Sequence, residues 1–399
     1  MVESEKKIFN FIMKWIKYDI DERSKYLANL LNYLRLPLIS KKELQRICDE
    51  PLLNSQKDCL IFIMKNYLFV DVDENIINAT VGTSQLYKPN IFFAIKGQSN
   101  GDDSCVKYMD LRHEDDLNWK SCDYSFFCPP RDNATLVVSD TGILLAFGGY
   151  NKLGEWNNCI DELDLTSTSK MWIPTTPLRK IRKQFAVSTQ GKFIYVVGGQ
   201  DPLGPTLSSI EYYDTDSKVW AEIEQPMPYP RYGCSAINHG SCLYVFGGYY
   251  NNDRLSRVDC YNLQEKLWKQ CNSMPTVADS MGITSGGNDL YLFGSYPSEI
   301  SEYAYKMNLT DLTWDKLPNM NNKKAFGNAV TFENDIFVVG KNSIRCLSKN
   351  EKSPDSVFCE RYIAEKKEWQ VINSKNKLID YDHIICLNDV RLKTFNIDL

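Results

Sequence analysis

The sequence predicts a mainly β protein, a six-bladed β-propeller preceded by a small α-helical domain. Six apolar, β-branched runs between residues 90 and 370 each end at or near a glycine, and a lone tryptophan follows each run 20 to 29 positions later. Residues 1–70 differ, because their apolar residues recur at helical spacing. We expect a helical domain over 1–75, a linker over 76–90 and the propeller over 91–399.

The propeller prediction depends on the length of the repeat. The runs read FFAIKG, LLAFGG, IYVVGG, LYVFGG, LYLFGS and IFVVGK, and the paired tryptophans, Trp119, Trp172, Trp220, Trp268, Trp314 and Trp369, lie 46 to 55 residues apart. A period near fifty that is built from short strands is typical of kelch propellers, in which each repeat forms one four-stranded blade. Each run is expected to be the second strand of its blade, and each tryptophan to lie on the fourth.

The repeated tryptophans and glycines are interpreted as structural rather than functional. An indole fills the space between adjacent blades, and a double glycine is needed where neighbouring backbones approach too closely for a Cβ atom. The first run, IFFAIKG, has no strand before it, whereas HIICL at 383–387 follows the last tryptophan. We expect this C-terminal segment to complete blade one, which would close the ring and remove an exposed edge.

The N-terminal segment is expected to form a small helical bundle. Apolar residues mark one face of a first helix with Ser4 as its cap, namely Ile8, Phe9, Ile12, Trp15 and Ile16. A second helix is expected to begin after Asp21 and to end at Pro37, a third to run over 41–49, and a fourth to begin at residue 55. Short connections between short amphipathic helices favour a packed bundle.

The stretch VESEKKIFNFIMKWIKYDIDERSKYLANLLNYLRLPLIS resembles the second half of a BACK domain. That domain lies between a BTB domain and a kelch propeller in the BTB–BACK–kelch family, the kelch-like proteins. The resemblance implies a non-enzymatic adaptor that recognises the substrate of a cullin-RING E3 ubiquitin ligase through its propeller. Other members of the family bind actin or the cytoskeleton, which is the alternative function.

Nothing in the sequence resembles a BTB domain, and the resemblance begins inside BACK. Cullin is therefore an expected partner only if the missing BTB and BACK region is present in the full-length protein. Two interpretations remain open: an incomplete version of a longer protein, or a truncated member that sequesters a target without recruiting cullin.

Composition excludes several classes of partner. The net charge of −5 gives no basic stripe for nucleic acid, and the longest apolar stretches, such as LIFIM at 60–64, are too short to cross a membrane. The 13 cysteines form no CxxC framework and no signal pattern precedes them, so reduced thiols and a cytoplasmic location are expected, with cytoskeletal association as a variant.

Enzymatic activity is not expected, and neither is a metal or a cofactor. The chain has three histidines, His113, His239 and His383, and no two of them are closely spaced. The sequence contains no GxSxG elbow, HExxH motif or phosphate-binding loop.

The candidate partner-binding residues lie in the loops at one end of the propeller. Cations recur before the first strand of several blades, at Arg131, Arg182, Arg231 and Lys324, although Asp279 interrupts the series. Converging cations would bind an acidic or phosphorylated peptide; the alternative is that these arginines bond strand-end carbonyls or solvate turns. Loops after the second strands add Tyr150, Asn151, Trp156, Asp201, Tyr249 and Arg254. Tyrosine, tryptophan and arginine dominate interface energetics, but the tyrosines could equally pack on their own blades and Trp156 could plug the channel.

Overall fold

The computed structural model divides into two compact units, Met1–Lys88 and Pro89–Leu399. It describes residues 2–23, 26–27, 30, 91–96, 105–113, 116–122, 125–129, 134–139, 141–148, 159–165, 167, 169–202, 204–251, 253–295, 301–322, 324–332, 334–342, 356–372, 378–379, 381 and 383–387. The expected linker and the predicted helices over 41–49 and from residue 55 lie outside these residues.

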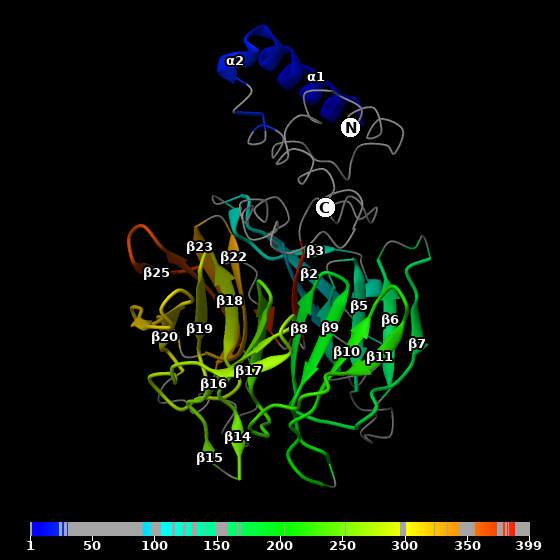
Figure 1. Ribbon diagram of the computed structural model, residues 1–399, viewed down its shortest axis with the longest axis vertical. Helices are drawn as coiled ribbons and strands as arrows, with labels where there is room; N and C mark the ends of the chain where they lie inside the picture. The colour runs from blue at the N-terminus through cyan, green and yellow to red at the C-terminus, as the bar shows by residue number, and fades with distance from the viewer. Residues whose placement is uncertain are drawn as a thin grey trace. The chain divides into compact units, whose positions relative to one another are not determined.

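Helix α1 (Val2–Tyr18) is amphipathic, and α2 (Ile20–Arg23) follows it directly (Figure 1). Its buried side chains are Phe9, Ile12, Met13 and Ile16, which recur at spacings of three and four. Ile8 and Trp15 were expected on this face but are exposed; the Trp15 ring is covered by the Arg23 guanidinium at 4.6 Å. The expected cap at Ser4 is wrong, because the helix already begins at Val2.

The second unit is the predicted six-bladed propeller. Its blades, each in order from the first strand to the fourth, are as follows: β27 (His383–Leu387), β1 (Ile91–Lys96), β2 (Cys105–Asp110) and β3 (Lys120–Cys122); β4 (Thr135–Val138), β5 (Ile143–Phe147), β6 (Ile160–Asp164) and β7 (Trp172–Thr175); β8 (Ala186–Gln190), β9 (Phe193–Val197), β10 (Ile210–Asp214) and β11 (Val219–Glu222); β12 (Ser235–His239), β13 (Cys242–Phe246), β16 (Val258–Asn262) and β17 (Leu267–Gln270); β18 (Gly282–Gly286), β19 (Asp289–Phe293), β20 (Ala304–Asn308) and β21 (Trp314–Lys316); β22 (Lys324–Phe332), β23 (Asp335–Asn342), β24 (Ser356–Ile363) and β25 (Glu368–Val371).

Three short elements accompany the blades. The hairpin formed by β14 (Tyr249–Tyr250) and β15 (Asp253–Arg254) projects from blade four, as Figure 1 shows. Strand β26 (Leu378–Ile379) pairs with β24, and a 3-10 turn, η6 (Ser125–Phe127), follows β3.

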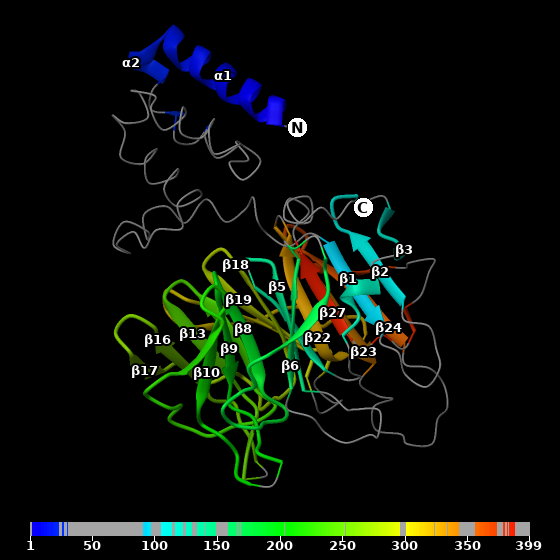
Figure 2. The same cartoon turned by 90° about the vertical axis from the view of Figure 1, so that its right-hand side faces the viewer.

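The C-terminal strand closes the ring as predicted. Strand β27 pairs antiparallel with β1, with Ile91 opposite Leu387 and Ile95 opposite His383. Figure 2 shows the red β27 beside the cyan strands β1 and β2. Blade one thus takes its first strand from the end of the chain, and the inner edge of β1 is paired rather than open.

The repeated tryptophans hold neighbouring blades together. Each indole N–H from Trp172 onward donates to a backbone carbonyl of the preceding repeat, over 2.8 to 3.1 Å. Rings from the second strands meet them edge-on: Phe147 meets Trp220 with centroids 6.0 Å apart, and Phe293 meets Trp369 at 5.6 Å. Trp119 and Trp220 are buried and the other four are half-buried, so the structural interpretation holds for the described indoles.

The glycines after the second strands are required by close backbone approach. Gly198 has a φ of +60°, and a Cβ atom there would overlap the carbonyl oxygen of Arg231 at the start of the next blade. The following amide, of Gly199, donates to that same oxygen over 2.9 Å. In blade six the strand does not turn at its glycine, because Lys341 and Asn342 continue β23 and pair with β22.

Candidate functional site

The antiparallel order of the strands fixes which loops share an end of the propeller. Loops from the second to the third strand, and from one blade to the next, emerge at one end, which we call the loop end. Turns from the first to the second strand, and from the third to the fourth, lie at the opposite end. The predicted partner-binding residues that the structure describes, Arg182, Asp201, Arg231, Tyr249, Arg254 and the backbone of Lys324, belong to the loop end.

Two of these predicted residues, Arg182 and Arg231, lie inside the propeller. Both side chains are fully buried, and they form ion pairs with Glu211 and Asp259 respectively, which are also fully buried. Arg182 Nη1 also donates to the carbonyl oxygens of Gly198 and Ser209, at 2.8 and 3.1 Å. Their expected contact with a partner is therefore corrected: these guanidiniums bond the strand ends of their own blade, which was the alternative interpretation.

The acidic partners recur at one position of the third strand. Asp161, Glu211, Asp259 and Glu360 are buried there, each opposite the penultimate apolar residue of its neighbouring second strand. A buried carboxylate is costly unless it is paired and hydrogen-bonded. Besides its ion pair with Arg182, the Glu211 carboxylate accepts hydrogen bonds from the backbone N–H groups of Arg179 and Lys180, at 2.7 and 3.2 Å.

Blades five and six differ from blades three and four at this buried position of the third strand. Glu360 accepts hydrogen bonds from the backbone and side-chain amides of Asn321 and Asn322, over 2.8 to 3.0 Å. In blade five Tyr305 replaces the acid. Ala278 stands where Arg231 stands in blade four, because its carbonyl accepts the Gly248 amide as the Arg231 carbonyl accepts the Gly199 amide, and Asp279 is the next residue. Burial raises the pKa of Asp279, while hydrogen bonds from Arg254 and Ser280 oppose that rise.

An aromatic surface covers the loop end of blade four. We call it the tyrosine–arginine patch; it consists of Tyr229, Tyr232, Tyr249, Tyr250, Arg254 and Arg257. Tyr232 and Tyr249 stack with centroids 5.3 Å apart and planes 11° apart, and their backbones pair through two hydrogen bonds. Tyr229 and Tyr250 meet edge-on, also at 5.3 Å, and Tyr229 is 40% exposed.

The two arginines of the patch are held in place by carboxylates. The Arg254 guanidinium lies 5.0 Å from the Tyr249 ring centroid while its Nε donates to Asp279 over 3.0 Å. Arg257 lies 5.2 Å from the Tyr229 centroid and donates to Asp259 over 2.8 Å. The patch therefore presents fixed aromatic rings, and both of its arginines are paired with carboxylates, although Asp259 is shared with the buried Arg231.

The other predicted site residues distribute as follows. Tyr249 and Arg254 belong to the patch, and Asp201 lies in the equivalent loop of blade three, in a turn closed by a 3.2 Å bond from the Gly204 amide to its carbonyl. Lys324 is the first residue of β22, and its backbone pairs with Asn342. The side chain of Lys324 lies outside the part of the chain that the structure describes. The same holds for the whole of four further residues, Arg131, Tyr150, Asn151 and Trp156.

Sequence reasoning missed Tyr229, Tyr232 and Arg257. The first two flank Arg231 in the segment YPRY just before β12, and Arg257 precedes β16. These residues could have been predicted from the sequence, because tyrosine and arginine are concentrated just before the first and third strands of this one repeat.

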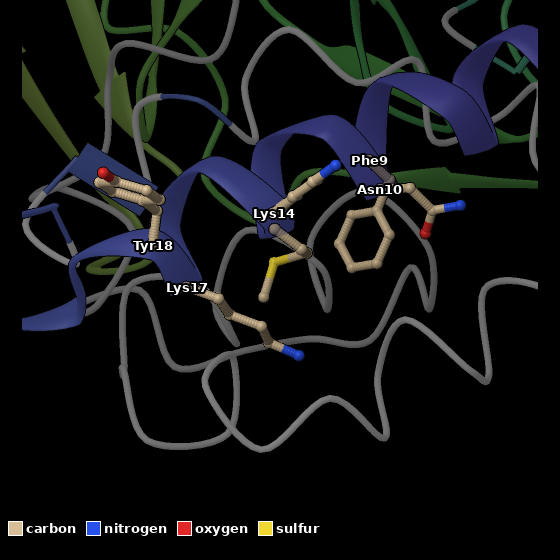
Figure 3. Close-up of a pocket in the computed structure, with 6 residues that line it drawn as sticks. Phe9, Asn10, Lys14, Lys17 and Tyr18 are labelled. Atoms are coloured by element: carbon tan, nitrogen blue, oxygen red, sulfur yellow. The ribbon is translucent and has the colours of Figure 1, made fainter.

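Two open depressions lie elsewhere. One, of about 480 Å³, runs along α1 (Figure 3) and is lined by Phe9, Asn10, Met13, Lys14, Lys17 and Tyr18. The other, of about 540 Å³, lies beside blade three next to Lys180 and Glu222. Within the described residues, no three His, Cys, Asp or Glu side chains gather in a way that could hold a metal ion. None of the described helices has the length and apolar character to span a membrane.

Family models match both units. The model described as "BTB And C-terminal Kelch" (BACK) matches residues 1–49, and the "KLHDC2/KLHL20/DRC7 Kelch-repeats domain" matches residues 174–341.

Curated proteins with similar sequences match much of the chain. Kelch-like protein 25 of Xenopus tropicalis is 22% identical over 355 residues, which cover 85% of this chain and 58% of that protein. Kelch-like protein 40 of the same species is 22% identical over 93% of this chain and 65% of its own length. Alpha-scruin of Limulus polyphemus is 23% identical over 199 residues, 46% of this chain. The chain thus spans about three fifths of the length of the kelch-like relatives that it matches.

Proposed function

From the BACK segment and kelch propeller that this chain shares with kelch-like proteins, we propose that it recognises a protein target and presents it to a cullin-RING ubiquitin ligase. The observation that carries the proposal is the tyrosine–arginine patch at the loop end of blade four. Loops that are held by a rigid scaffold are a common place for binding residues.

The composition and rigidity of the patch support a protein partner. Tyrosine and arginine are the residues enriched among interface hot spots. The stacked pair Tyr232 and Tyr249 is fixed by two backbone bonds of 2.8 and 3.1 Å, so little conformational entropy remains to be lost on binding. Half-buried aromatic rings that are already ordered are well suited to hold an apolar or aromatic side chain of a partner.

The existing ion pairs of the arginines favour one class of partner segment. Arg254 and Arg257 are already paired with Asp279 and Asp259, and Arg182 and Arg231 are buried. A strongly acidic or phosphorylated peptide would have to compete with these internal carboxylates. We therefore propose an extended segment anchored by an aromatic or apolar side chain, with hydrogen bonds to the tyrosine hydroxyls.

The neighbouring loops extend the proposed surface. Asp201 belongs to the equivalent loop of blade three, and Arg131, Tyr150, Asn151, Trp156 and Lys324 are assigned to the same end by their place in the repeats. Recruitment of cullin is proposed to require a BTB region in the full-length protein. The cytoplasm is the proposed location.

The test is affinity purification of the tagged product of the full-length transcript from proteasome-inhibited cells, followed by mass spectrometry. The variant Tyr249→Ala/Arg254→Ala removes the centre of the patch, whereas Lys366→Ala alters an exposed turn at the opposite end. We expect cullin with both variants, and an enriched, ubiquitinated target with Lys366→Ala only. Actin or filament proteins without cullin would contradict the adaptor function and favour a cytoskeletal one.

A further inference from the structure

Three cysteines share one face of blade four. Cys242 opens β13 and lies opposite Asn262, whereas Cys260 on β16 lies opposite Tyr244. Because alternate residues of a strand share a face, this register places Cys242 and Cys260 diagonally on the same side of the sheet. Cys271 extends β17 on that side, where its amide donates to the Val258 carbonyl over 3.0 Å.

The three thiols belong to one cluster of packed side chains. Cys260 and Cys271 are among its buried residues, and Cys242 packs against it. Cys260 and Cys271 are buried against Leu290, Leu292 and Met307 of blade five, while Cys242 is half-buried beside the turn from β12. The trio therefore has one accessible member and two shielded ones.

Hydrogen bonding stabilises a thiolate at Cys242. The hydrogen bond from Cys260 lowers the pKa of Cys242 to about 6, against burial and the nearby Glu265, which act to raise it, and with further lowering by Tyr244 and Ser241. His239, directly opposite in the ladder, has its own pKa lowered by burial and so brings no charge at neutral pH.

Cys260 can donate its hydrogen bond to the thiolate of Cys242 or to that of Cys271, but not to both at once. Cys260 has a single S–H proton to donate, and its hydrogen bonds to both neighbours raise its own pKa. Cys242 has the additional hydroxyl donors and the greater exposure, so it is the reactive member.

We propose that Cys242 is an oxidation site for hydrogen peroxide, with Cys260 as the thiol that captures the product. The Cys242 thiolate attacks one peroxide oxygen, the O–O bond breaks, and sulfenic acid and hydroxide form; the sulfur is oxidised and the peroxide reduced. The Cys260 thiol then attacks the sulfenic sulfur, an S–S bond forms, and water leaves. This site lies at the end of blade four opposite the tyrosine–arginine patch and does not depend on the proposed function.

The first test is alkylation of the full chain by iodoacetamide at several pH values, read by peptide mass spectrometry. Cys159, which is exposed and outside the trio, and Cys234, whose pKa burial raises to about 11, are matched controls. A thiol with a pKa near 6 gains about 30-fold in thiolate fraction at pH 7 over an ordinary one, but loses about 10-fold in intrinsic nucleophilicity. The pH dependence of alkylation therefore distinguishes Cys242 from an ordinary thiol better than the alkylation rate at a single pH does.

We expect Cys242 to react with a midpoint near pH 6, and roughly 10-fold faster than Cys159 at that pH. Tyr244→Phe together with Cys260→Ala, which removes both hydrogen-bond donors, should move the midpoint upward. A midpoint above pH 8 in the unaltered chain would overturn the proposal.

The second test follows the products after peroxide treatment. We expect a peptide cross-linked through Cys242 and Cys260 in the unaltered chain, and a dimedone-labelled Cys242 that no longer forms a cross-link in Cys260→Ser. Faster oxidation of Cys159 than of Cys242, or a Cys242 that stays reduced while Cys159 is oxidised, would contradict the assignment.

Discussion

Arg182 and Glu211 form an ion pair inside blade three in which both side chains are fully buried. Arg182 ties the segment that enters the blade to the ends of its second and third strands, through Gly198 and Ser209. Arg231 and Asp259 repeat the arrangement in blade four. The pairs fix the base of the loops on which the proposed partner surface is built.

Removing one member of such a pair should destabilise the propeller. Arg182→Ala leaves Glu211 buried without its counter-charge, which should cost about 3–5 kcal/mol in the free energy of unfolding. The control is Lys180→Ala, which breaks the exposed pair with Glu222 and should cost about 0–1 kcal/mol. Denaturant unfolding measures both, and equal values would contradict the structural role of Arg182.

Trp220→Ala should destabilise the propeller by about 3–5 kcal/mol, as truncation of large buried aromatics does. The indole fills the boundary between blades two and three and donates to the Thr176 carbonyl over 2.9 Å. Trp220→Phe keeps most of the packing and loses this hydrogen bond, so its cost should be clearly smaller. Unchanged melting temperatures for both variants would contradict the assignment of the blade boundary.

Two glycines with similar backbone angles provide a matched pair. Gly198→Ala would bring a Cβ atom against the Arg231 carbonyl, whereas a Cβ at Gly240 would meet nothing within 4 Å, although φ is +60° and +58° respectively. Gly240→Ala should therefore cost only the left-handed backbone penalty of about 1–2 kcal/mol. Gly198→Ala should cost more in the same unfolding assay, and the reverse order would contradict the close approach of blades three and four.

Asp110 should make stability depend on acid pH. Although burial raises the pKa of this carboxyl, hydrogen bonds from Arg112 and the charge of Arg112 outweigh burial and hold the pKa below its usual value of 3.8. Because the folded pKa is the lower one, the stabilisation is present above about pH 4 and is lost as the pH falls through the folded pKa. The stability difference between the unaltered chain and Asp110→Asn should shrink in that window; a constant difference from pH 6 to 2 would contradict this.

The repeated elements were predictable because their signals are local. A β-branched run that ends in glycine identifies a second strand wherever it occurs, and the unpaired run at 91–97 required a strand from elsewhere, which HIICL supplies as β27. The helical face of α1 was predicted from the same kind of periodicity, but its cap was not, since Val2 and Glu3 already continue the helix before Ser4.

The candidate site was less predictable because burial is a tertiary property. Arg182 and Arg231 appear as surface cations in sequence, and their acidic partners lie 28 to 29 residues downstream on third strands. Likewise, the stacking of Tyr232 on Tyr249 joins the entry of blade four to the hairpin after its second strand. A local stretch of sequence shows neither which of its residues are buried nor which distant residues they contact.

The central claim is that the tyrosine–arginine patch binds the protein target, and the dissociation constant of the purified target tests it most directly. We expect Tyr249→Ala to weaken binding by about 30-fold, as loss of a hot spot of about 2 kcal/mol would. Lys366→Ala, at the opposite end, should leave the dissociation constant unchanged. Equal affinities for Tyr249→Ala and the unaltered chain, with both folded, would contradict the claim.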